Sequence, residues 1–141
     1  MVKISKVLFV CVRNSGRSQM AEAFLNQMAK GKGKAKSAGT RPARRLDDNV
    51  IEIMWEAGIE ISRQRPKLLT PKLVDWADRV ITMGCGVEEA CPANLAVSED
   101  WDIADPIDKP VEEVRRIRDE ISTRVTDLLR EIQKMGNLKG G

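Results

Sequence analysis

The chain contains no histidine, and this absence excludes several classes of site. Without histidine there is no Ser-His-Asp or Cys-His catalysis, no histidine-ligated metal or haem, and no histidine switch at physiological pH. Tyrosine is absent as well, and aromatic residues make up only 4% of the chain. Stacking surfaces for single-stranded nucleic acid are therefore not expected, and a carboxylic acid is the natural proton donor in any catalysis.

A strong charge of one sign and long apolar runs are also missing. Lysine and arginine total 24 against 21 aspartates and glutamates, and the net charge of +3 is too small to indicate nucleic-acid binding, although it suits a small anionic substrate. The apolar run at residues 7–12 is too short for a signal peptide or a membrane span. We therefore expect a cytoplasmic protein that binds neither nucleic acid nor membrane.

The chain does have enough apolar residues for one core, and it has three cysteines. A length of 141 residues with 42% hydrophobic residues predicts a single domain, residues 1–141, and we expect a monomer. The cytoplasm keeps thiols reduced, so an odd number of cysteines indicates catalysis, redox exchange or metal binding rather than a structural disulfide.

Short apolar runs alternate with segments of helical periodicity. Strands are expected at residues 7–10, 35–38, 79–83 and 97–101. Helices are expected after the first strand, after Asp47 or Asp48, from Thr70–Pro71, and from Val111 to Ile132, with a frayed tail from Gly136. This alternation predicts an α/β fold in which helices cover both faces of a parallel sheet.

The loop after the first strand carries the strongest functional signal. Five residues, Val12, Arg13, Asn14, Ser15 and Gly16, separate Cys11 from Arg17 and Ser18. Such a loop, leading into a helix, can point successive main-chain N–H groups at one spot and so form a cradle for a tetrahedral oxyanion. Arg17 can close the cradle, and the same positive field can stabilise Cys11 as a thiolate nucleophile, with Ser18 donating to the sulfur. The alternative is a buried cysteine that merely ends a strand.

This loop and several later segments resemble one known family. The similar segments are Lys6–Cys11, Ser37–Thr40, Ile81–Met83 and Trp101–Pro106. The family comprises the low-molecular-weight protein tyrosine phosphatases and the thioredoxin-coupled arsenate reductases that share their fold. The resemblance implies a flavodoxin-like three-layer sandwich with a four-stranded parallel sheet of order 2-1-3-4.

The resemblance also implies roles for individual residues. These roles are nucleophile for Cys11, loop shaping for Asn14, anion binding for Arg17 and general acid for Asp105. By composition alone, an aspartate before a proline indicates only a turn. Two loop positions depart from the family: Gly16 stands where many members have a second loop cysteine, and Arg13 stands where glycine is common.

Two further cysteines, Cys85 and Cys91, follow the third predicted strand. They resemble the redox segment of arsenate reductases. The resemblance implies that Cys85 attacks Cys11 as arsenic is reduced and that Cys91 then attacks Cys85, which leaves a disulfide for thioredoxin or a similar dithiol donor. Two other interpretations stay open: inert small hydrophobes, or zinc ligands together with Cys11, although the five-residue gap exceeds the usual ligand spacing.

The expected mouth of the loop offers little to an aromatic substrate. Its rim, residues 40–43, contains no aromatic side chain on which an aryl phosphate could stack. Trp55 and Trp76 fall in predicted helices, where we expect core positions.

The sequence also bears on whether a cation binds next to the Cys11 loop. Some reductases of the family bind potassium through positions that match Asn14, Glu22 and Ser37. The remaining carboxylate position is Lys67 here, and its ammonium could replace the ion. No metal and no cofactor are therefore expected.

The sequence as a whole favours a thioredoxin-coupled arsenate reductase. The alternative is a low-molecular-weight phosphatase that hydrolyses tyrosine phosphate or small phosphomonoesters through a phospho-Cys11 intermediate. Two other classes are a redox sensor, which binds a partner only when Cys85 and Cys91 are joined, and a zinc-binding module.

Overall fold

The computed structural model describes residues 5–83 and 99–140, and side chains as far as residue 134. Four parallel strands form one sheet in the order β2-β1-β3-β4. They are β1 (Ser5–Cys11), β2 (Gly33–Gly39), β3 (Arg79–Met83) and β4 (Glu99–Trp101). The α/β class, the flavodoxin-like architecture and the expected strand order are confirmed.

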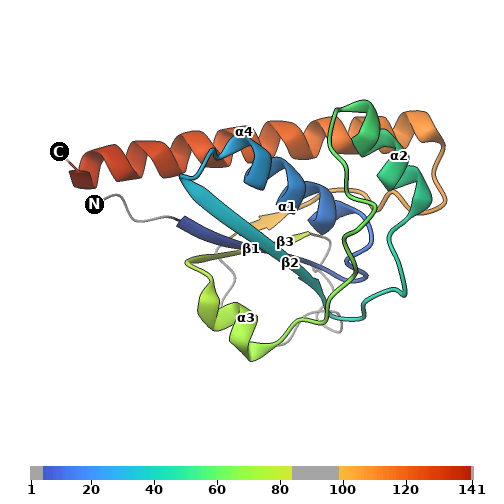
Figure 1. Ribbon diagram of the computed structural model, residues 1–141, viewed down its shortest axis with the longest axis horizontal. Helices are drawn as coiled ribbons and strands as arrows, with labels where there is room; N and C mark the ends of the chain where they lie inside the picture. Colours follow the sequence, from blue (N-terminus) through green and yellow to red (C-terminus); the bar gives the residue numbers. More distant parts are fainter. Residues whose placement is uncertain (1–4, 84–98, 141) are drawn as a thin grey trace.

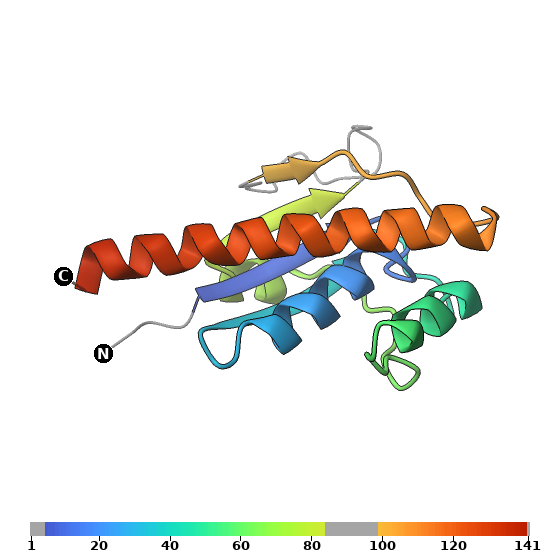
Figure 2. The same ribbon diagram turned by 90° about the horizontal axis from the view of Figure 1, so that it is seen from above.

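Helices cover both faces of the sheet, as Figure 1 shows. They are α1 (Arg17–Met28), α2 (Asp48–Glu56), α3 (Pro71–Trp76) and α4 (Val111–Gly140). One face packs against α1, α2 and α4, and the other packs against α3. Figure 2 shows how α4 extends along the length of the sheet.

Strand β1 is buried on both faces because its side chains alternate between two apolar clusters. Val7, Phe9 and Cys11 belong to the larger cluster with α1, α2 and α4. Leu8 and Val10 belong to the smaller cluster, against which side chains of α3 pack. The continuous apolar run that identified this strand in the sequence therefore reflects a central position in the sheet.

Local signals fix several helix starts. Asp47 caps α2, since its side chain accepts a hydrogen bond of 3.0 Å from the main-chain N–H of Asn49. Thr70 caps α3 in the same way, and Pro71 occupies the first helical position. The predicted starts of both helices are confirmed.

Other expectations need correction. β2 begins at Gly33, two residues before the predicted start, because it keeps its register with β1 as far as the Ser5–Gly33 pair. α4 continues to Gly140, where we expected fraying from Gly136. Trp55 is 65% exposed instead of buried, and Trp76 is only partly buried, under the ammonium of Lys36.

Trp101 is the tryptophan that does enter the core. It ends β4, is 2% exposed, and its ring centroid lies 5.5 Å from that of Phe9 on β1. Within residues 5–83 and 99–140, no helix is long and apolar enough to cross a membrane.

Candidate active site

Cys11 is the last residue of β1, and α1 begins six residues later at Arg17. The cysteine is 2% exposed. Its Sγ lies 2.8 Å from the Ser18 hydroxyl and accepts a 3.2 Å hydrogen bond from the main-chain N–H of Asn14. Asn14 has a φ of 52°, the left-handed conformation that asparagine tolerates better than most residues. The loop therefore turns back over its own cysteine.

The carbonyl groups of the loop point outward, toward residues 40–47. Main-chain N–H groups of that segment donate to four of them, the carbonyls of Cys11, Val12, Arg13 and Ser15, at 2.8–3.2 Å. Outward carbonyls leave the N–H groups of the loop facing inward, and the first N–H groups of α1 have no acceptor within their own helix. This is the geometry of an oxyanion site at a helix N-terminus. Residues 40–43, expected at the rim, thus hold the loop through their main chain.

Arg17 and Asp105 meet beside this loop. The Arg17 guanidinium is largely buried, donates 3.0 Å to the carbonyl of Ile103, and lies 3.5 Å from Asp105 Oδ2. The other Asp105 oxygen accepts a 3.0 Å hydrogen bond from the main-chain N–H of Ile107. A fixed carboxyl group is therefore placed next to the residue expected to bind the anion.

Glu22, Ser37 and Lys67 form a polar group behind the loop. The Lys67 ammonium lies 3.5 Å from Glu22 Oε1, which also accepts a 3.2 Å hydrogen bond from Ser37. Burial raises the pKa of Glu22, and the charge of Lys67 offsets part of that rise. Within the described residues, no three histidine, cysteine, aspartate or glutamate side chains gather as metal ligands.

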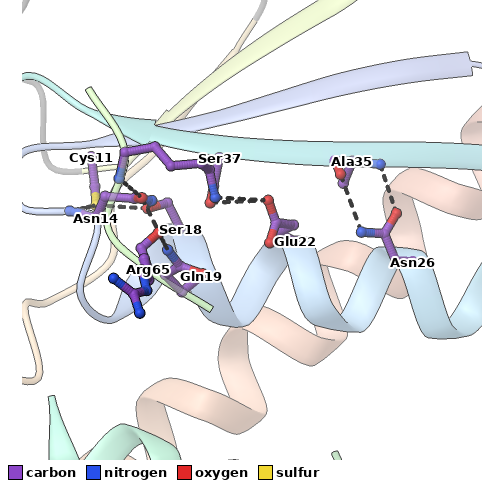
Figure 3. A network of polar contacts seen from close by, with 10 residues as sticks. Cys11, Asn14, Ser18, Gln19, Glu22, Asn26, Ala35, Ser37 and Arg65 are labelled. Atoms are coloured by element: carbon purple, nitrogen blue, oxygen red, sulfur yellow. Dashed lines mark hydrogen bonds and ion pairs between the residues drawn. The ribbon is translucent and has the colours of Figure 1, made fainter. Parts of the chain in front are cut away.

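Gln19 belongs to the same buried region, and sequence reasoning missed it. Its side chain is completely buried and donates 3.0 Å hydrogen bonds both to Asn14 Oδ1 and to the main-chain carbonyl of Arg65. Figure 3 shows these contacts together with those of Glu22. No sequence signal marked this residue, because Arg65 lies 46 positions away and contributes only its main chain.

A groove of about 420 Å³ opens beside the loop. Its lining comes from the loop, the start of α2 and the segment after Asp105: Arg13, Ser15, Arg45, Leu46, Asp47, Asp48, Asn49, Ile107 and Asp108. None of these residues is aromatic. Most of them are polar or charged. Residues 40–43, which we expected at the mouth of the loop, are not part of this lining.

Comparison with known proteins agrees with this geometry. The model for the low molecular weight phosphotyrosine protein phosphatases matches residues 6–138. The chain belongs to this family. A glutaredoxin arsenate reductase from Synechocystis is 37% identical over 131 residues, which cover 92% of this chain and 99% of that protein.

Two solved structures of similar proteins share the fold. A thioredoxin-dependent arsenate reductase from Corynebacterium glutamicum has a TM-score of 0.78 at 37% identity, and the match covers 94% of this chain and 63% of that one. An arginine phosphatase from Geobacillus stearothermophilus has a TM-score of 0.79 at 32% identity, with 93% and 94% covered. The resemblance stated from the sequence is confirmed, and the similar proteins carry both reductase and phosphatase names.

One departure from the family has a steric counterpart in the structure. At Gly16, a Cβ atom would lie 3.0 Å from Cγ of Pro106, the residue after Asp105. Glycine thus lets the segment that carries Asp105 pack directly on the loop. The cysteine that many family members have at this position would press against Pro106.

Cys85 and Cys91 lie outside the described residues. The strand before them, β3, ends at Met83 and pairs in parallel with β1, with Thr82 opposite Val10. β3 therefore ends at the same edge of the sheet as Cys11. The relay implied by the resemblance stays a prediction.

Proposed function

We propose that this protein reduces arsenate to arsenite, with Cys11 as the nucleophile. The observation that carries the proposal is the setting of Cys11 Sγ, which lies at the start of α1 with two hydrogen-bonding partners and with Arg17 and Asp105 alongside. Arsenate needs a tetrahedral anion site, a soft nucleophile and a proton for the departing oxygen. The names of the similar proteins favour arsenate over other oxyanions.

In the proposed reaction, the Cys11 thiolate attacks arsenate and forms a sulfur–arsenic bond. Asp105 donates a proton to the oxygen that leaves as water, while Arg17 and the loop N–H groups hold the other oxygens. Cys85 then attacks Cys11 Sγ, and the electron pair of the sulfur–arsenic bond reduces arsenic(V) to arsenic(III), which leaves as arsenite. Cys91 attacks Cys85, which frees Cys11 and leaves a Cys85–Cys91 disulfide.

A dithiol protein would regenerate the enzyme by reducing that disulfide. We propose thioredoxin or an equivalent donor, since one similar protein is named for thioredoxin and another for glutaredoxin. Assays that supply each donor in turn, with arsenite formation as the readout, identify the reductant. The enzyme is proposed to act as a monomer without a cofactor.

Mass spectrometry of the fully reduced protein mixed with stoichiometric arsenate tests the relay. The intact mass should fall by about two units as one disulfide forms, and peptide mapping should place it between Cys85 and Cys91. Phosphate is the control and should cause no change. The Cys91→Ser variant should instead stop with Cys11 joined to Cys85, and arsenite formation that persists in Cys85→Ser would contradict the relay.

Phosphatase activity through a phospho-Cys11 intermediate is the second candidate. The specific observation is the groove of about 420 Å³, which is far larger than an inorganic oxyanion requires. Its lining carries carboxylates at Asp47, Asp48 and Asp108 and guanidinium groups at Arg13 and Arg45, and Arg45 pairs with Asp48 at 3.2 Å. This charged lining suits a polar or charged leaving group better than an aromatic one, and one similar protein is named an arginine phosphatase.

Phosphoarginine, a small alkyl phosphate and an aryl phosphate, assayed side by side, test this candidate. Hydrolysis of phosphoarginine in preference to the aryl ester is expected, and it should survive Cys85→Ser because phosphoryl transfer needs only one cysteine. Preference for the aryl ester would contradict the assignment of the groove.

A further inference from the structure

A chain of buried hydrogen bonds leads from Cys11 to the main chain of residues 65–67 (Figure 3). It passes from Cys11 Sγ to Ser18 Oγ at 2.8 Å and from Ser18 Oγ to Asn14 Nδ2 at 2.7 Å. From Asn14 Oδ1 it reaches Gln19 Nε2 at 3.0 Å, and Gln19 reaches the carbonyl of Arg65 at 3.0 Å. The three intermediate side chains are completely buried, so the chain is shielded from water.

Two main-chain groups fix the direction of these hydrogen bonds. The N–H of Lys67 can only donate, and it lies 2.8 Å from Asn14, which must therefore present its oxygen. The carbonyl of Arg65 can only accept, so Gln19 must present its NH₂ group. The two assignments are consistent, because Gln19 Nε2 also donates to Asn14 Oδ1. Turning either amide over would place two donors or two acceptors face to face.

The same donor–acceptor order extends from Asn14 through Ser18 to the sulfur of Cys11. With Oδ1 of Asn14 occupied by two donors, its Nδ2 donates to the Ser18 hydroxyl. A hydroxyl has one proton, and the proton of Ser18 is then free to point at Cys11 Sγ. Together with the main-chain N–H of Asn14, the sulfur receives two donors, which stabilise negative charge on it.

We propose that Gln19 is a positioning residue: held by the Arg65 carbonyl, it presents its NH₂ group to Asn14 Oδ1 and, together with the Lys67 N–H, keeps the Asn14 amide in the orientation that makes Ser18 a donor toward Cys11. The proposal rests on Cys11 being the nucleophile of the proposed function. It does not depend on arsenate being the substrate.

Alkylation of Cys11 by iodoacetamide tests this direction. The protein carries Cys85→Ser and Cys91→Ser, so that Cys11 is its only thiol and no arsenate chemistry can occur. Gln19→Glu replaces the donor by an acceptor, which favours a turned Asn14 amide that draws the Ser18 proton away from the sulfur. We expect alkylation near neutral pH to slow about tenfold, the equivalent of one hydrogen bond to a charged group, and to recover at alkaline pH.

Gln19→Leu is the matched control. It removes the same donor, but the Lys67 N–H still holds Asn14 Oδ1, so we expect alkylation to slow by less than about threefold. In a Ser18→Ala background, Gln19→Glu should have no further effect, because the two residues act in series. A wild-type rate in Gln19→Glu, or an undiminished effect in the Ser18→Ala background, overturns the proposal.

If Gln19→Glu does not fold, Ser18→Ala alone still tests whether Ser18 donates a hydrogen bond to Cys11. Loss of a donor to the sulfur slows alkylation, whereas loss of an acceptor leaves it unchanged or faster. An unchanged or faster rate would mean that Cys11 donates to Ser18, opposite to the direction proposed here. None of these alkylation measurements involves arsenate. They can therefore contradict the role of Gln19 without bearing on the reductase proposal, and the reductase proposal can fail without affecting them.

Discussion

Gly39, the last residue of β2, has no space for a side chain. A Cβ atom there would lie 2.6 Å from the carbonyl oxygen of Val12 and 3.0 Å from the main-chain nitrogen of Asn14. Both atoms belong to the loop between Cys11 and Arg17, so the strand and the loop are in direct main-chain contact. At the residue scale, this glycine sets how closely β2 approaches the loop that we propose as the anion site.

Gly39→Ala should therefore displace the loop. We expect the free energy of unfolding to fall by about 1–3 kcal/mol, as for other overpacked sites, and the affinity for phosphate or arsenate to fall as well. Urea denaturation and calorimetric titration measure the two effects.

Gly33→Ala, on the same strand, is the control, since the nearest atoms to its Cβ are at 3.5 Å. It should change stability by less than about 1 kcal/mol and leave anion affinity unchanged. Equal effects of the two substitutions would show that strand conformation, and not contact with the loop, is responsible.

At the scale of elements, a side chain of α1 pairs with the outer edge of the sheet at Ala35. β2 is an edge strand, and its Ala35 main chain bonds on the outer side to Asn26. The Asn26 amide donates 3.1 Å to the Ala35 carbonyl and accepts 2.8 Å from the Ala35 N–H. It thus takes the place of a neighbouring strand and joins α1 to β2.

Asn26→Ala should destabilise the protein by about 1–2 kcal/mol, the usual range for two neutral hydrogen bonds. Gln27→Ala, at an exposed position next to it on α1, is the matched control and should stay within about 0.5 kcal/mol of wild type. Denaturant midpoints of the three proteins provide the comparison. Similar midpoints for the two variants would show that the edge contact adds no stability.

At the scale of the whole molecule, the sheet brings distant segments to one edge. Cys11 ends β1, residues 40–47 follow β2, and residues 103–105 follow β4. Residues 65–67, between α2 and α3, close the loop from behind. Parallel strands make this possible because all their carboxyl ends lie on the same side.

The buried carboxylate of Glu22 should make global stability depend on pH. Its raised pKa means that the folded state binds the proton more tightly than the unfolded state does. This contribution to stability is therefore fully present below the ordinary glutamate pKa and is lost as pH rises through the raised value. Glu22→Gln should remove this contribution, so that the difference in unfolding free energy between wild type and variant changes with pH; urea denaturation of both proteins across pH 4–8 measures it.

Lys67→Met should make the unfolding free energy decrease more steeply as pH rises, because the charge of Lys67 lowers the pKa of Glu22 toward its ordinary value. We expect a loss of about 1–2 kcal/mol at neutral pH, less than for a fully buried pair because the Lys67 side chain is 42% exposed. Lys67→Arg keeps the charge and serves as control. Parallel pH profiles of wild type and Lys67→Met would rule out this coupling.

Much of the fold could be predicted from the sequence because local rules determine it. The apolar run of β1, the caps of α2 and α3 and the periodicity of α4 each depend on neighbouring residues only. The strand order came from resemblance. Sequence reasoning misjudged features that depend on other segments, such as the start of β2, which follows its pairing with β1, and the exposure of Trp55.

The same division holds for the candidate site. By itself, the sequence determined the loop from Cys11 to Ser18 and its place between a strand and a helix. Only the tertiary structure decided that Arg17 meets Asp105 and that Gln19 reaches the Arg65 carbonyl. Contacts across tens of residues depend on how the sheet and helices pack together, and no local pattern encodes the direction of a hydrogen bond to a main-chain group.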